Sequence, residues 1–127
     1  MTADRILLFA GGLSGAAGVA LSAAAAHQGG GTVTTAASFL LMHAPAFAAI
    51  GLGADRFAGR TPLRVGGFVL LVGLALFSGD LLMRHYTGDR LFPMAAPSGG
   101  TLMIGGWSIV ALSALWRREP VGAKREG

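Results

Sequence analysis

The chain has 127 residues, of which 53% are hydrophobic and only 13% are charged, with a formal net charge of +4. So few charges argue against a soluble domain, and the length argues against a second domain. Because there is no cysteine, disulfides, thiolate metal sites and cysteine nucleophiles are excluded. The basic residues flank apolar segments rather than follow one face, so we expect no nucleic-acid partner.

The first predicted membrane-spanning helix covers about residues 6–26. No charged residue occurs between Ile6 and Ala54, and a helix surrounded by lipid must be apolar on all sides. The small residues from Ser22 to Ala26 also resemble a signal-peptide cleavage site, and cleavage there would leave three spans. We expect the helix to be retained, because its apolar run is long and its basic start is weak.

The second predicted helix covers about residues 35–54. It follows a glycine-rich turn, residues 27–31, that lets the chain reverse direction and form a helical hairpin. Pro45 lies two residues after His43 and removes one backbone hydrogen bond. We expect it to bend this helix or loosen its early turns.

The third and fourth predicted helices cover about residues 63–83 and 98–116. Thr61 and Pro62 provide a start for the third, while Pro97 and a basic segment bound the fourth. The whole chain, residues 1–127, is therefore predicted to be one all-α integral membrane domain, a compact bundle of four transmembrane helices.

The basic residues predict how this bundle is oriented. One side carries only Arg84 and Arg90, and the other carries the remaining eight: Arg5, Arg56, Arg60, Arg64, Arg117, Arg118, Lys124 and Arg125. Because basic flanks favour the cytoplasm, both termini are predicted to be cytoplasmic, with residues 117–127 as a basic tail.

Small residues in regular rows are predicted to bring the helices together. Gly11 and Gly15 are one turn apart in the first helix, and Gly79 and Gly105 offer matching surfaces in the third and fourth. In lipid, close van der Waals contact across such rows supplies much of the association. We expect packing within one bundle, while a homo-oligomer or docking onto a larger membrane complex is the alternative use.

Five polar side chains are predicted in the outer half of the bundle: His27, His43, Asp80, Arg84 and His85. Ionisable groups at membrane depth are costly and usually face the interior, where they pair or line a wet cavity. Asp80 and Arg84 have the i, i+4 spacing of a helical ion pair. The same cluster could instead handle a proton or bind a ligand.

His43 is the strongest candidate for a ligand or metal site, because it should lie deepest, whereas His27 and His85 are expected at the interface. Met42 and Met83 fall in the same half, and imidazole with thioether ligands would suit Cu(I). Haem held by two histidines is a further alternative. Since no specific metal-ligand spacing is present, we predict no cofactor.

Several blocks of sequence carry a family resemblance: Gly12 to Leu21, His43-Ala44, Leu76 to Gly79, and Gly105 to Trp107. In their order and spacing they resemble the domain-of-unknown-function family 423, which consists of small four-span membrane proteins. The resemblance covers the chain from about Leu8 to Trp116. It implies a bacterial inner-membrane location, with mitochondrial relatives, and no settled biochemical activity.

These observations predict a non-enzymatic accessory or scaffold protein embedded in the lipid bilayer. Ser78 has no neighbouring base in the sequence and lacks the strand-turn-helix context of a hydrolase nucleophile, so we expect no enzymatic activity. The alternative is a binding or transport module, in which a polar, methionine-bearing pocket with His43, Asp80 and His85 handles a proton, a metal or a small ligand.

Overall fold

The computed structural model describes residues 2–117. This part of the chain forms four long helices and one short 3-10 helix, η1: α1 (Ala3–Gln28), α2 (Thr32–Gly53), η1 (Ala54–Arg56), α3 (Arg60–Thr87) and α4 (Ala95–Ser113). The four long helices are all long and apolar enough to cross a membrane. The predicted all-α, four-span fold is therefore confirmed, while the basic tail lies outside the described residues beyond Arg117.

The helix boundaries differ from the predicted ones by a few residues. α1 begins at Ala3 because the hydroxyl of Thr2 caps it, accepting from the Arg5 amide at 3.4 Å. α4 begins at Ala95 and ends at Ser113, three residues earlier than predicted at each end. Pro97 thus lies in its first turn, where a missing N–H costs little. Pro45 does not interrupt α2, which continues through it.

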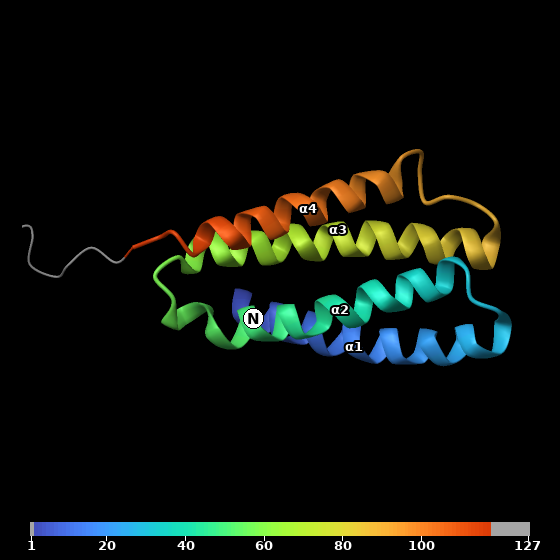
Figure 1. The fold of residues 1–127 in the computed structure, drawn as a ribbon, viewed down its shortest axis with the longest axis horizontal. Coiled ribbons are helices and arrows are strands. Elements are labelled where there is room, and N and C mark those ends of the chain that lie inside the picture. The colour runs from blue at the N-terminus through green and yellow to red at the C-terminus, as the bar shows by residue number, and fades with distance from the viewer. Residues whose placement is uncertain (1, 118–127) are drawn as a thin grey trace, which may run out of the picture.

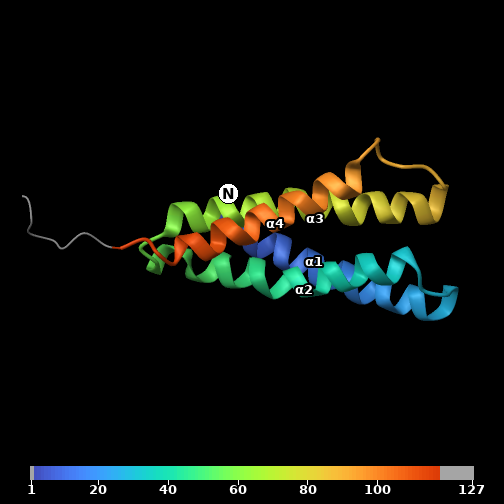
Figure 2. The same ribbon diagram turned by 45° about the horizontal axis from the view of Figure 1, so that its top comes forward.

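The helices form two antiparallel hairpins, α1 with α2 and α3 with α4, joined mainly through α2 and α3 (Figure 1). Figure 2 shows the same two pairs from a second direction. α4 packs closely on α3 alone, and α2 and α4 hardly approach each other through their backbones. Both ends of the described chain lie at one end of the bundle. We call the opposite end, with loops 29–31 and 88–94, the outer end, as the positive charges predict.

Glycines set the closest helix contacts within each hairpin. A Cβ on Gly73 would lie 2.8 Å from the carbonyl oxygen of Gly99, and one on Gly66 would lie 3.1 Å from that of Gly106. On α1, a Cβ on Gly11 would lie 2.8 Å from the Ala44 carbonyl oxygen of α2. Both hairpins therefore need these glycines to close.

The structure differs from the prediction at two of the four proposed packing glycines, Gly79 and Gly105. A Cβ on Gly105 would meet no atom within 4 Å, so this residue takes no part in packing within the bundle. Gly79 faces Leu91 in the α3–α4 loop rather than another helix. Gly15, like Gly11, faces α2, where an added Cβ would lie 3.6 Å from the Cβ of Ala44. The packing positions on α4 are Gly99 and Gly106 instead.

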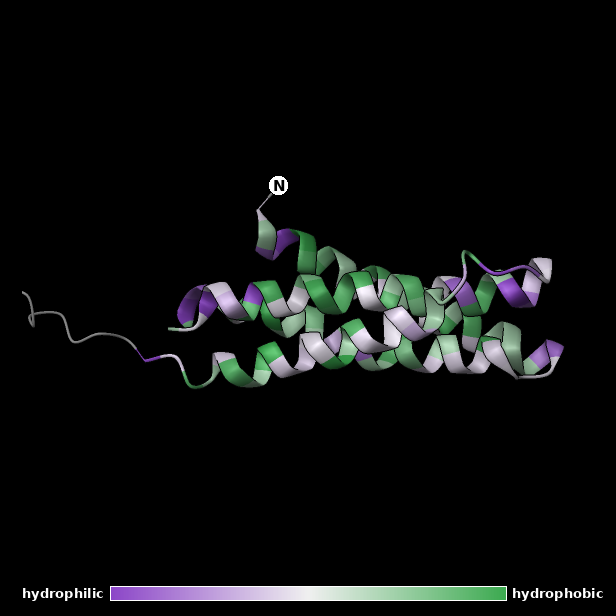
Figure 3. Ribbon diagram, turned by 90° about the horizontal axis from the view of Figure 1, so that it is seen from above, coloured by the Kyte–Doolittle hydropathy of each residue, from purple (hydrophilic) through white to green (hydrophobic). Residues whose placement is uncertain are grey.

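The most hydrophilic residues gather towards the two ends of the bundle, and the middle is mostly hydrophobic (Figure 3). At one end Arg64 of α3 binds Asp4 and Asp55, and near the other Arg84 binds Asp80. Sixteen residues separate Arg64 from Asp80 along α3, a rise of about 24 Å at 1.5 Å per residue. This approaches the roughly 30 Å of a bilayer's hydrocarbon core. We therefore expect the two charged clusters to lie near the two edges of the lipid-embedded region.

Candidate functional site

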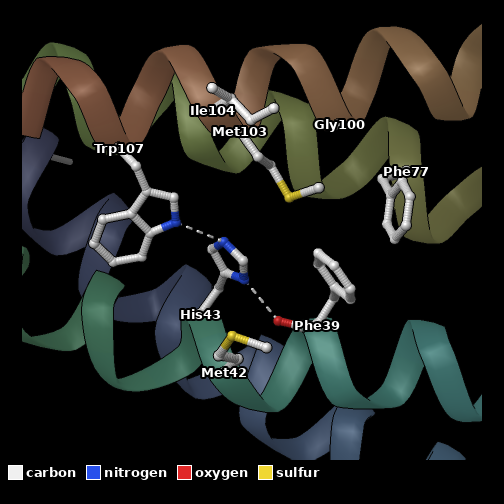
Figure 4. A pocket seen from close by; sticks show the side chains of 8 residues that line it. All are labelled: Phe39, Met42, His43, Phe77, Gly100, Met103, Ile104 and Trp107. Atoms are coloured by element: carbon white, nitrogen blue, oxygen red, sulfur yellow. Dashed lines mark hydrogen bonds between the residues drawn. The ribbon is translucent and has the colours of Figure 1, made fainter.

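The most distinctive polar group inside the bundle is His43, which lies at the middle of α2 and is only 3% exposed. It borders a cleft of about 330 Å³ between α2, α3 and α4 (Figure 4). The other lining residues are almost all apolar: Phe39, Met42, Phe77, Gly100, Met103, Ile104 and Trp107. The cleft is thus an aromatic and thioether surface with one imidazole.

Both ring nitrogens of His43 are engaged in hydrogen bonds. Nδ1 lies 2.8 Å from the carbonyl oxygen of Phe39, and Nε2 lies 3.2 Å from Nε1 of Trp107 (Figure 4). An indole N–H can only donate, so Nε2 must accept its hydrogen bond. Nδ1 then carries the proton and donates to the Phe39 carbonyl. The two bonds together select a single tautomer of the uncharged imidazole.

Aromatic rings surround the imidazole. Its centroid lies 6.1 Å from that of Phe39, 6.2 Å from that of Phe47 and 5.8 Å from that of Trp107. Phe39 in turn contacts Phe77 of α3, with the centroids 4.6 Å apart. Because α2 and α4 hardly approach each other elsewhere, the bond from Trp107 to His43 links the two hairpins across the cleft.

This arrangement does not support the metal alternatives. Neither nitrogen of His43 has a lone pair left for copper or haem, because one carries a proton and the other accepts from Trp107. Met42 lines the cleft, but Met83 does not. Within residues 2–117, no group of three or more His, Asp or Glu is placed to hold a metal ion.

The predicted i, i+4 ion pair between Asp80 and Arg84 is present. Asp80 is fully buried, and its Oδ2 accepts from Arg84 Nη2 at 2.6 Å. Its Oδ1 accepts from the backbone amide of Leu91 at 3.0 Å. Both carboxylate oxygens are therefore engaged, and they tie the end of α3 to the loop that leads into α4.

The predicted polar pocket is divided in the structure. Asp80 and Arg84 bind each other and the loop at the outer edge, whereas His43 lies deeper and bonds to Trp107. His27 and His85 are both exposed at the outer end, and His85 has an edge contact with Tyr86. The bundle does not bring these five side chains into one site, because their helices place them at different depths.

Two residues that join separate helices of the bundle were missed from the sequence. Trp107 lies well inside a span, although tryptophan usually lies at the membrane interface, so its position already indicated a need for a hydrogen-bond acceptor. The second is Arg64, which the sequence singles out only as one of the basic residues that predict the orientation of the bundle. It binds Asp4 through two nitrogens, at 2.7 and 2.5 Å, and Asp55 at 2.6 Å. Nothing local in the sequence connects residues 60 positions apart.

Comparisons with known proteins agree with this architecture. Residues 14–100 match the family described as "Protein of unknown function (DUF423)". A UPF0382 membrane protein of Staphylococcus epidermidis is 30% identical over 82 residues, which cover 63% of this chain and 64% of the relative. The UPF0382 membrane protein YwdK of Bacillus subtilis is 25% identical over 75 residues, 59% of this chain and 61% of the relative. The match thus spans less than two thirds of each relative, and no solved structure is significantly similar.

Proposed function

Since the chain belongs to the DUF423 family of unknown function, we propose that it is a non-enzymatic accessory protein that docks a helix of a partner membrane protein along α4. The relatives that it matches are bacterial membrane proteins. The protein itself is a multi-pass membrane protein. The partner is either a second copy or a larger membrane complex.

The observation that carries this proposal is the uncovered outer face of α4. Apart from the contact of Trp107 with His43, this helix packs closely only on α3, and added Cβ atoms at Gly100 and Gly105 would meet nothing within 4 Å. Ile104 between them is 72% exposed, and Leu112 two turns further is 60% exposed. Open glycines beside large apolar side chains give a partner helix both a close approach and something to pack against.

The state of the polar groups supports a role without catalysis. The imidazole of His43, the carboxylate of Asp80 and the guanidinium of Arg64 all hydrogen bond to other groups of the same chain. An acid, base or nucleophile would need to reach a substrate. These side chains instead connect helices, as expected of groups that stabilise a membrane bundle.

Gly105→Leu tests this proposal, because an added Cβ at this position meets no atom of its own bundle within 4 Å. We expect the variant to fold normally and to lose the complex that the wild-type protein forms in mild detergent, as measured by size-exclusion chromatography with light scattering. Gly12→Leu on α1 is the matched control, since its Cβ is equally open. A Gly105→Leu protein that keeps the wild-type complex contradicts docking along α4.

A second candidate function rests on the cleft beside His43. Its volume of about 330 Å³ suits a small apolar molecule entering from the lipid. Gly100→Leu should fill the cleft without a clash, because an added Cβ has no atom within 4 Å. In a Trp116→Phe background, a brominated alkane should quench Trp107 fluorescence, and Gly100→Leu should reduce this quenching. Equal quenching in both proteins argues against ligand binding in the cleft.

A further inference from the structure

A second cleft lies on the other side of the contact between α2 and α3, where it faces α1. It has a volume of about 300 Å³. Leucines and alanines form most of its walls, among them Leu13, Ala17 and Leu21 on α1 and Leu71 and Ala75 on α3. The His43 cleft lies instead on the α4 side; both clefts border α2 and α3, but they have no lining residue in common.

One polar atom in this second cleft has no partner. The side chain of Ser78 lines the cleft and is 4% exposed, yet its hydroxyl makes no hydrogen bond within residues 2–117. By contrast, the hydroxyls of Thr101 and Ser108, also in helices, donate to carbonyl oxygens one turn earlier. A buried hydroxyl without a partner is costly. A ligand atom that accepts a hydrogen bond would satisfy the Ser78 hydroxyl.

The depth of Ser78 identifies the kind of acceptor. It lies two residues before Asp80, which we expect near the outer edge of the lipid-embedded region. Below it, the cleft continues along α3 to Leu71, a rise of about 10 Å at 1.5 Å per residue. We therefore expect the hydroxyl near the level of the ester groups of outer-leaflet lipids, with the apolar walls extending below it into the hydrocarbon region.

We propose that this cleft binds a phospholipid of the outer leaflet, with one acyl chain between α1 and α3 and its ester carbonyl accepting a hydrogen bond from Ser78. The apolar walls accommodate the upper half of the chain. Above Ser78, the same row of α3 continues through Leu82 to His85, which is exposed at the level of the headgroup. Such a lipid would exchange more slowly than its neighbours in the bilayer.

The experiment compares two lipids that differ only at the ester. The detergent-purified protein is titrated with a diacyl phosphatidylglycerol or with its diether analogue, which lacks the carbonyl, and bound lipid is counted by native mass spectrometry. We expect the wild-type protein to bind one diacyl lipid about fivefold more tightly than the diether lipid, the difference made by about one hydrogen bond. Ser78→Ala should bind both lipids equally, with the weaker affinity.

Two further variants separate the cleft from the hydrogen bond. Ala75→Leu fills the cleft and should abolish binding of both lipids, whereas Val72→Leu, on the same helix but outside the cleft, should behave as wild type. Helix content by circular dichroism checks that each variant folds. The proposal is overturned if wild-type protein binds the diacyl and diether lipids equally, or if Ala75→Leu retains the lipid as well as Val72→Leu does.

Discussion

The hydrogen bond between Trp107 and His43 offers a direct test of how the two hairpins are held together. Trp107→Phe keeps an aromatic ring in the cleft but removes the indole donor that lies 3.2 Å from Nε2 of His43. Because the imidazole is only 3% exposed, its lone pair would remain buried without a partner. The substitution therefore removes a hydrogen bond and leaves an uncompensated acceptor.

Two known energies set the range of the expected loss in the free energy of unfolding. An unsatisfied buried polar atom costs about 1–3 kcal/mol, whereas hydrogen bonds between membrane helices contribute about 0.6 kcal/mol on average. The cleft opens towards lipid, which offers no replacement donor, so we expect the free energy of unfolding to fall by about 1–2 kcal/mol. His43→Phe combined with Trp107→Phe removes both polar atoms. The double variant should lower the free energy of unfolding by less than the sum of the two single variants, with a difference of about 0.6–1 kcal/mol.

Reversible unfolding with SDS in mixed micelles, followed by circular dichroism, measures these differences. Trp116→Phe is the control, since Trp116 is 61% exposed and lies beyond the last residue of α4, at the end of the bundle that carries both termini. If Trp107→Phe costs no more than Trp116→Phe, or if the double variant is strictly additive, the bond does not hold the hairpins together and the reasoning fails.

Three further predictions concern the helix contacts and the charged clusters. Gly99→Ala places a Cβ 2.6 Å from backbone atoms of α3 and should lower the SDS unfolding midpoint, while Gly105→Ala, with open space around it, should leave the midpoint unchanged. Asp80→Ala removes the acceptor for the Leu91 amide, so limited proteolysis should cleave loop 88–94 faster than in wild type. Arg64→Lys keeps the charge but cannot bind two carboxylates through a planar fork, so it should also lower the SDS midpoint. An unchanged midpoint for Arg64→Lys, or unchanged cleavage for Asp80→Ala, would show that these clusters do not tie their helices together.

The four spans could be predicted from the sequence because every helix that is surrounded by lipid must be long and apolar. A segment without charges from Ile6 to Ala54 leaves few alternatives to a membrane hairpin. The ion pair of Asp80 with Arg84 was equally accessible, because both residues lie on one helix at a fixed spacing. Local geometry was sufficient in both cases.

The contacts between helices could not be predicted in the same way. Gly105 and Gly106 are adjacent, and one residue changes the direction of a side chain by about 100° around a helix. Only the register of α3 against α4 determines that Gly106 packs and Gly105 faces outward. The partner of His43 depends on the same register, since Trp107 is 64 residues away. Rotation and register thus limit what the sequence reveals of the site.

Photocrosslinking in intact membranes tests the central claim, that α4 docks a partner helix. A photoreactive amino acid at Ile104, which is 72% exposed on α4, is compared with one at Val19, which is 63% exposed on α1. We predict one defined protein adduct from position 104 that Gly105→Leu suppresses, and none from position 19, with mass spectrometry distinguishing a second copy from another protein. Adducts to lipid alone at position 104, or the same protein adducts from both positions, would contradict the proposed function.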